Sequence, residues 1–162
     1  MASRARVTAP RPRACAPPRA QLALLVAGGL SMLPPYLGPL LGLELDIRTS
    51  VEVVDHVLPG AVAALCGGLT ALRSHRAVEA QSVPNLLLYS SAFLAGLFQT
   101  ATHAPLVLDA GEPLTPWGAV LLHSTLAPVI TVIALWLTAT SAMAVFPGSS
   151  EPERPRRGRP RR

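Results

Sequence analysis

Lysine is absent from this sequence, so all 14 of its basic residues are arginine. Charged residues make up only 14 % of the chain and aromatic residues only 4 %, whereas hydrophobic residues make up 50 %. A typical soluble domain carries about 25 % charged residues, so this composition argues against one and is typical of a membrane protein. The exclusive use of arginine is typical of a GC-rich genome, and we expect a bacterial source.

Cysteine and catalytic motifs are scarce as well. Of the two cysteines, Cys15 lies in an arginine-rich tail and Cys66 in the middle of an apolar run. We therefore expect no disulfide between them, and we expect Cys66 to pack as a small apolar residue. The sequence lacks the motifs of serine hydrolases, zinc peptidases, thiol oxidoreductases, P-loop proteins and dinucleotide-binding enzymes. It therefore gives no support for an enzymatic function.

What the sequence does contain is a set of long apolar runs, at about 20–43, 53–72, 85–103 and 118–146. Each reaches or nearly reaches the roughly 20 residues that an α-helix needs to cross about 30 Å of hydrocarbon. We therefore predict an all-α fold, an integral membrane four-helix transmembrane bundle over residues 20–146. Residues 1–19 and 147–162 are rich in Arg and Pro and lack apolar periodicity, which predicts disordered tails.

The placement of arginine predicts the orientation of this bundle. Five arginines precede the first run, two lie between the second and third, six follow the fourth, and only Arg48 falls in a loop of the other side. The positive-inside rule then places both termini and the 73–84 loop in the cytoplasm of a multi-pass protein of the cell membrane. A basic start before an apolar run also occurs in signal peptides, but this run is longer than their apolar region and ends in no A-x-A site.

The basic tails suggest partners as well. Arg157-Gly158-Arg159-Pro160 resembles the core of the AT-hook motif, which binds the DNA minor groove. The likeness covers four residues of a tail made largely of Arg and Pro, so nucleic acid is not an expected partner. We expect the arginine tails to contact anionic lipid head groups of the bilayer.

Small and polar residues form a stripe along each run at helical spacing. Membrane helices associate through such residues, because lipid tails do not drive helices together as water does. In the third run the predicted stripe is Ser91, Ala95, Gln99 and His103. These stripes would face the interior of the bundle or a neighbouring chain in a homo- or hetero-oligomer.

Three of the four histidines fall at one level of the predicted bundle. His56 lies near the outer end of the second run, His103 ends the third, and His123 lies six residues after Trp117, a predicted interface anchor. We predict that these imidazoles converge at the outer end and form a metal site, with Asp55, Gln99 and Ser124 as supporting polar residues. His75 is the exception, since it falls in the predicted cytoplasmic loop.

Prolines interrupt three of the runs at a similar height. Pro59 and Pro128 cannot donate to the carbonyl groups four residues earlier, which belong to Asp55 and Ser124. Pro34–Pro35 interrupts the first run at a comparable height. Kinks at this level would open the outer end into a small polar vestibule.

Several chemistries are compatible with such a cluster. Three imidazoles can hold copper or zinc, two can ligate a haem iron, and Asp55, His56 and His123 can pass a proton. The alternative is a non-catalytic structural or accessory subunit of a membrane complex, whose polar stripes only pack helices. No two of the histidines share a short ligand motif such as HxxxH, so the sequence leaves the ligand open.

Overall fold

The computed structural model describes residues 18–43, 49–74, 83–112 and 116–146. Throughout these ranges the chain is helical or forms short turns, and no strand occurs in them. The all-α prediction is therefore confirmed for this part of the chain. The predicted tails, together with Cys15 and His75, lie outside the described residues.

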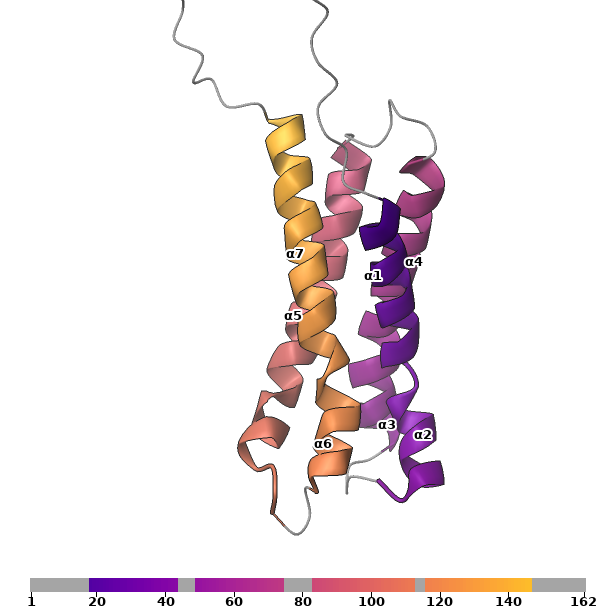
Figure 1. Cartoon of the computed structure of the whole chain (residues 1–162), viewed down its shortest axis with the longest axis vertical. Coiled ribbons are helices and arrows are strands. Elements are labelled where there is room, and N and C mark those ends of the chain that lie inside the picture. Colours follow the sequence, from indigo (N-terminus) through magenta and orange to yellow (C-terminus); the bar gives the residue numbers. More distant parts are fainter. Residues whose placement is uncertain (1–17, 44–48, 75–82, 113–115, 147–162) are drawn as a thin grey trace, which may run out of the picture.

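The helices follow the apolar runs, but several are interrupted (Figure 1). The first run forms α1 (Pro18–Ser31) and α2 (Pro34–Leu41), which meet at an angle of 50°. The second forms α3 (Thr49–Glu52), a π-helical turn η1 (Val53–Val57) and α4 (Leu58–Ser74). The third forms α5 (Val83–Leu108), and the fourth forms α6 (Trp117–Ser124) and α7 (Leu126–Val145).

Two of the helical stretches are long and apolar enough to cross a membrane, namely Ser50–Arg73 and Trp117–Val145. The bent pair α1–α2 becomes a third if it is counted as one broken span. Helix α5 is 26 residues long, but it carries polar residues such as Asn85, Gln99 and His103 and is not among these stretches. The described part of the chain is thus all-helical with two or three candidate membrane spans.

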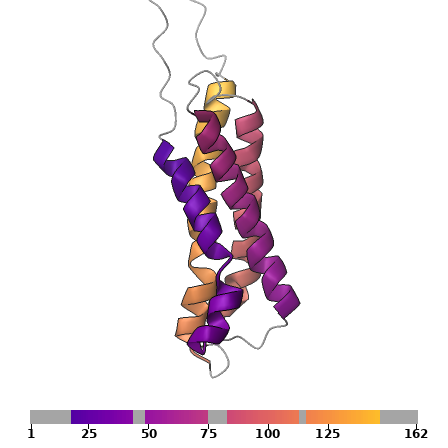
Figure 2. The ribbon, with the colours of Figure 1, turned by 90° about the vertical axis from the view of Figure 1, so that its right-hand side faces the viewer.

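The long helices lie side by side in a ring. Helix α1 packs on α4, α4 on α5, α5 on α7, and α7 on α1 (Figures 1 and 2). The short elements gather at one end, where α2 contacts both α6 and η1, and η1 also contacts α5. This end, at the bottom of Figure 1, is where the interrupted segments of three different runs meet.

Prolines account for these interruptions. Pro34 starts α2 just after the bend, and Pro59 is the second residue of α4, which follows η1. Because Pro59 has no N–H for the Asp55 carbonyl, the regular α-helical pattern cannot continue through this turn, and the turn before it widens to a π-helix. Pro128 lies in the first turn of α7, just after the break at Thr125. Each proline thus shapes the end of the molecule at which α2, η1 and α6 meet.

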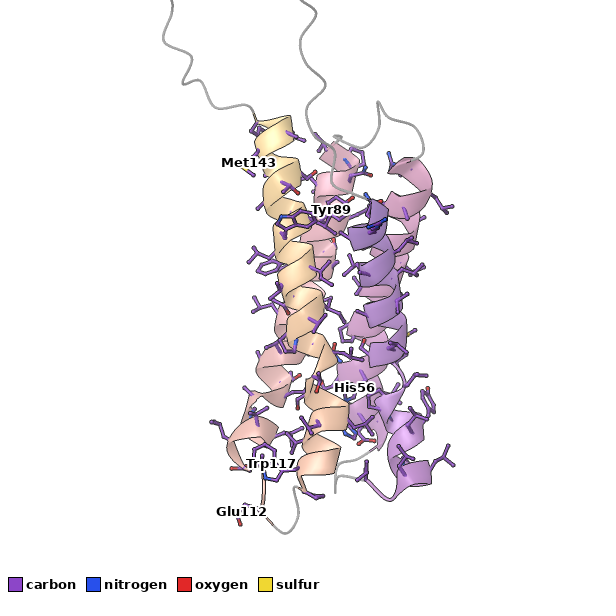
Figure 3. All side chains as sticks on the ribbon, viewed as in Figure 1. His56, Tyr89, Glu112, Trp117 and Met143 are labelled. Atoms are coloured by element: carbon purple, nitrogen blue, oxygen red, sulfur yellow. The ribbon has the colours of Figure 1, made fainter. Side chains whose placement is uncertain are left out.

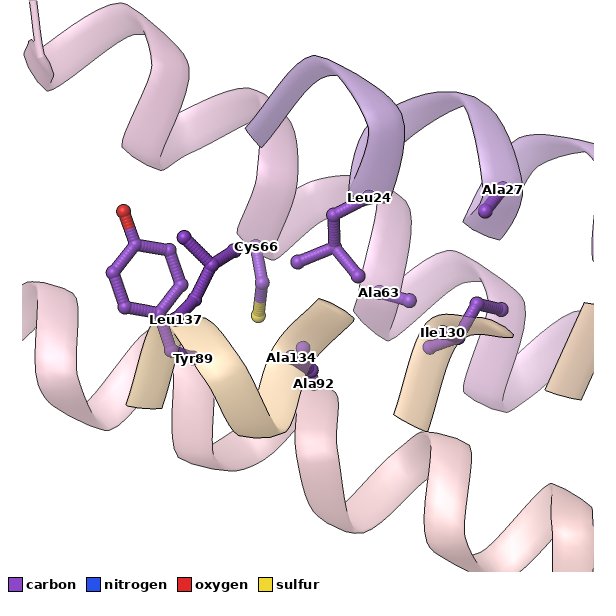
Figure 4. Close-up of a cluster of buried hydrophobic side chains, with 9 residues drawn as sticks. All are labelled: Leu24, Ala27, Ala63, Cys66, Tyr89, Ala92, Ile130, Ala134 and Leu137. Atoms are coloured by element: carbon purple, nitrogen blue, oxygen red, sulfur yellow. The ribbon is translucent and has the colours of Figure 1, made fainter. Parts of the chain in front are cut away.

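The middle of the ring is filled by a small apolar cluster, shown in Figure 4. Its members come from α1, α4, α5 and α7 and are Leu24, Ala27, Ala63, Cys66, Tyr89, Ala92, Ile130, Ala134 and Leu137. Small residues let the backbones approach closely: a Cβ atom on Gly28 would lie 2.5 Å from the Ala64 nitrogen. The packing is therefore of the small-residue type that membrane helices use.

One predicted stripe is wrong in part. Ser91 is exposed and its hydroxyl donates to the Leu87 carbonyl over 3.0 Å, whereas Ala92 and Gly96 are buried with Gln99 and His103. A strict spacing of four residues turns by about 40° more than a full turn at each step, since a helix turns about 100° per residue. Three such steps from His103 therefore place Ser91 about 120° away from the buried face.

Candidate functional site

Three imidazoles meet at the end of the ring where the short elements gather. His56 comes from η1, His103 from α5 and His123 from α6, and their exposed fractions are 1 %, 5 % and 3 %. The ring centroids of His56 and His103 are 4.6 Å apart, and those of His56 and His123 are 5.2 Å apart. Figure 3 shows His56 in the same half of the molecule as Trp117 and Glu112, with Tyr89 and Met143 towards the opposite end. We call His56, His103 and His123 the histidine cluster.

A closed set of hydrogen bonds fixes the protons on two of these rings. His103 Nδ1 donates to the main-chain carbonyl of Gln99 over 2.7 Å, so a neutral His103 has a lone pair on Nε2. That nitrogen lies 3.0 Å from His56 Nε2, which must therefore be the donor of this bond. His56 Nδ1 is then the acceptor, and the Gln99 side-chain Nε2 donates to it over 3.1 Å. The chain of bonds begins and ends on Gln99.

His123 is held in a similar way but faces an acid. Its Nδ1 donates to the main-chain carbonyl of Ala119 over 2.9 Å, and its Nε2 lies 3.5 Å from a carboxylate oxygen of Glu52. Two lone pairs facing each other repel, so this pair is attractive only when a proton or another cation lies between them. A cation between Glu52 and His123 would therefore be stabilised by both side chains.

A cavity of about 240 Å³ lies beside the cluster. All three histidines line it, together with acidic and polar side chains and a few apolar ones: Val51, Glu52, Asp55, Thr102, Pro105 and Leu106. The cavity corresponds in place to the predicted polar vestibule. Two carboxylates and the Thr102 hydroxyl therefore share one small space with the three imidazoles.

The supporting residues divide into two groups. Gln99 bonds directly to His56, and Asp55 lines the same cavity as the histidines. Ser124 lies apart from this cavity: it lines a second one of about 320 Å³ between α5 and the α6–α7 break, and its hydroxyl has no partner among the described residues. Because Ser124 follows His123 directly, it points about 100° further round the helix.

Glu52 is a site residue that sequence analysis did not single out. It precedes His56 by four residues, and residues at this spacing share one face of a helix. That spacing is the signal that would have found it. Because Glu52 directly precedes the second predicted run, 53–72, the apolar pattern alone assigns it to a loop.

The cluster is not a preformed metal site. As the side chains stand, no group of three or more His, Cys, Asp or Glu within 18–43, 49–74, 83–112 and 116–146 is arranged to hold a metal ion. The reason is the direct bond between His56 and His103: a tetrahedral zinc with bonds of about 2.05 Å needs its nitrogens roughly 3.3 Å apart, with a lone pair on each. Their Nε2 atoms are 3.0 Å apart and share a proton.

Comparisons of the chain with protein-family models, with curated proteins and with solved structures give no match.

Proposed function

We propose that this chain is a four-span integral membrane protein, with both termini in the cytoplasm, that binds a transition metal ion through His56, His103 and His123. The ion would be copper or zinc, for which neutral imidazole is a suitable ligand. The cluster would face the outer side of the membrane.

The buried polar residues of α5 support its role as a span. Asn85, Gln99 and His103 lower its hydropathy, but they are 0 %, 1 % and 5 % exposed and so would not meet lipid. The surface that α5 presents includes Leu87, Leu94 and Phe98. A helix with buried polar residues and an apolar exposed surface is suited to a membrane helix bundle.

The arrangement of the helix ends supports the orientation. Helix α1 begins, α4 ends, α5 begins and α7 ends at one end of the ring (Figure 1). The segments adjoining these ends hold 13 of the 14 arginines of the sequence. The exposed Trp117, a side chain suited to the membrane interface, lies at the opposite end with the histidine cluster (Figure 3).

The observation that carries the metal proposal is the anchoring of His103 and His123. Each donates its Nδ1 proton to the carbonyl four residues earlier, which directs the Nε2 lone pair into the space shared with His56 and Glu52. Metal-ligating histidines are oriented in this way by a carbonyl or carboxylate on the second ring nitrogen. A cation in that space would have two imidazoles already turned towards it.

The geometry favours an ion over haem. His56 and His103 bond directly to each other, so a porphyrin between them would require the helices to separate. The adjoining cavity of about 240 Å³ is also smaller than the roughly 300–1,000 Å³ typical of pockets for larger ligands.

The arrangement also argues against transport through the ring. A second buried polar contact, in which Gln21 donates to the Tyr89 hydroxyl over 2.7 Å, lies towards the opposite end. The apolar cluster of Figure 4 occupies the space between. A cation at the histidine cluster would therefore enter and leave on the same side.

A structural or accessory role is the competing function, and one observation favours it. The closed set of bonds through Gln99, His56 and His103 gives all four ring nitrogens of the two histidines a partner without any ligand. Such a set could serve only to hold η1 against α5. The test must therefore distinguish ligand binding from stability.

The test is a metal titration of the protein in detergent after treatment with a chelator. Wild type is expected to bind one Zn²⁺ or Cu²⁺ per chain, and a His56→Ala/His123→Ala double variant is expected to lose this binding. Tyr89→Phe is the matched control, because it removes a buried interhelical bond far from the cluster. Binding that persists in the double variant would mark the ion as adventitious, and wild type that binds no ion while the double variant is less stable would favour the structural role. A Soret band in the purified protein would instead indicate haem.

A further inference from the structure

Gln99 contacts two of the three histidines at once. Its main-chain carbonyl accepts from His103 Nδ1 over 2.7 Å, and its side-chain Nε2 donates to His56 Nδ1 over 3.1 Å. The residue is 1 % exposed, so water does not compete for these bonds. Its side-chain oxygen Oε1 is buried with no partner among the described residues. The amide nitrogen thus forms a hydrogen bond, whereas the amide oxygen forms none among the described residues.

The amide has two orientations with opposite consequences for His56. With Nε2 towards the ring, as in the structure, His56 Nδ1 must be an acceptor, so its proton is on Nε2 and is shared with His103. With Oε1 towards the ring, Nδ1 must carry the proton and Nε2 becomes a lone pair. The lone pairs of His56 and His103 would then face each other, which is favourable only if a cation lies between them.

We propose that Gln99 is a positioning residue that selects the protonated nitrogen of His56, and that its amide turns over when a cation enters the cluster. The proposal deepens the proposed function and, for the cation, rests on it. In the resting state the amide stabilises the His56–His103 hydrogen bond. In the loaded state it would hold His56 as a ligand, as the Gln99 and Ala119 carbonyls hold His103 and His123.

The proton balance of this change is neutral. His56 has one ring proton before and after: the Nε2 proton would leave to solvent through the adjoining cavity, which His56 lines, and Nδ1 would take one from solvent while the Gln99 amide is turned away. The cation takes the place of the Nε2 proton between the two rings. No ring changes its charge, so this step needs no acid or base beyond water.

The proposal predicts different effects on Zn²⁺ affinity for two substitutions at position 99. In Gln99→Glu the carboxylate can only accept, so Nδ1 is kept protonated, and we expect Zn²⁺ affinity equal to or above that of wild type. In Gln99→Met the acceptor is gone, and we expect affinity to fall by about 10- to 100-fold, the usual effect of removing a partner of a metal ligand. If Gln99 served only for packing, both substitutions would weaken binding to a similar degree, and that result would overturn the proposal.

The state of His56 is read directly by ¹⁵N NMR of the imidazole nitrogens in the full chain, with the signals assigned by His→Ala variants. Ion-free wild type is expected to carry the His56 proton on Nε2, and both Zn²⁺-loaded wild type and ion-free Gln99→Glu are expected to show it on Nδ1. The same nitrogen protonated in all three samples would refute the assignment. The two ion-free samples test Gln99 even if wild type binds no metal, so this failure is distinct from that of the proposed function.

Thr100→Val supplies the matched control. Thr100 adjoins Gln99 on α5, and its hydroxyl bonds to the Gly96 carbonyl over 2.8 Å and to Thr131 over 3.0 Å, away from the cluster. We expect this variant to keep the wild-type ¹⁵N pattern and Zn²⁺ affinity. A shift of the His56 signals in Thr100→Val as large as in Gln99→Glu would mean that any disturbance of α5 moves them, and would count against Gln99.

Discussion

At the scale of single residues, the site depends on which ring nitrogen each histidine offers. His103 and His123 both donate Nδ1 to a carbonyl one helical turn earlier, whereas His56 depends on a side chain of another helix. The sequence places the three histidines at a common level, because depth in a span follows from residue count. It does not contain the ring orientations, because these depend on how η1, α5 and α6 are rotated against one another.

Glu52 provides a prediction at this scale. Its carboxylate lies 3.5 Å from His123 Nε2, so Glu52→Gln removes one of the two negative charges that line the cavity beside the proposed cation. We expect Zn²⁺ affinity to fall by about tenfold or more, as for other groups that support a metal ligand. Isothermal titration calorimetry in detergent measures the change. Glu112→Gln, an exposed acid outside the cavity, is the control, and an equal loss there would point to a general effect of charge.

At the scale of the helices, the apolar runs predict where helices form, and the prolines predict where they break. The rotation of each helix is harder to predict, as the exposed Ser91 shows. A four-residue spacing and a mixed spacing of three and four look equally regular in a sequence, but only the mixed spacing stays on one face over three turns. Ala92, Gly96, Gln99 and His103 have the mixed spacing, and they are the buried set.

Two adjacent glycines of α1 test the packing on α4. A Cβ atom on Gly28 would lie 2.5 Å from the Ala64 nitrogen and 2.7 Å from the Gly60 carbonyl oxygen, whereas one on Gly29 would meet nothing within 4 Å. We expect Gly28→Ala to destabilise the protein by about 1–3 kcal/mol. Gly29→Ala should be neutral or slightly stabilising, since alanine favours a helix over glycine. Thermal unfolding in detergent compares the two, and equal melting temperatures would contradict this close contact.

The break between α6 and α7 makes a further prediction. Pro128 has no N–H for the Ser124 carbonyl, and His123 lies on the short helix before the break. Pro128→Ala restores the donor and favours one continuous helix, so we expect it to raise the melting temperature while lowering Zn²⁺ affinity, because His123 is moved from its position. The same substitution would raise both quantities, or leave the affinity unchanged, if the break did not position His123.

At the scale of the whole molecule, the sequence predicts that the fold is all-helical. It predicts less well which of the four apolar runs are membrane spans. Composition and run length can be read from the sequence, so predictions based on them do not require knowledge of the packing. Helix α5 is not among the stretches that are apolar enough to span alone, because Asn85, Gln99 and His103 lower its hydropathy, but these three residues are buried. Only the packing shows that these residues would not meet lipid if α5 crosses a membrane, as we propose.

Cysteine labelling tests the proposed orientation. Cys66 is 5 % exposed and Cys15 is predicted to be cytoplasmic, so a membrane-impermeant maleimide should not label wild type in intact cells. Glu112→Cys places a thiol at an exposed position near the histidine cluster and should be labelled. Permeabilised cells should show labelling of both proteins. Labelling of wild type before permeabilisation would reverse the topology.

The apolar cluster lies between the histidine cluster and the Gln21–Tyr89 contact, and it affects how a bound ion would respond to the membrane voltage. Carrying one elementary charge across the whole membrane takes about 2.3 kcal/mol per 100 mV. In the proposed topology, a divalent ion that stopped at the histidine cluster would travel through only part of that field, because the apolar cluster fills the middle of the ring. Its occupancy would then follow the metal concentration outside the cell and respond little to the membrane voltage, as suits a store or a sensor of the exterior rather than a pump.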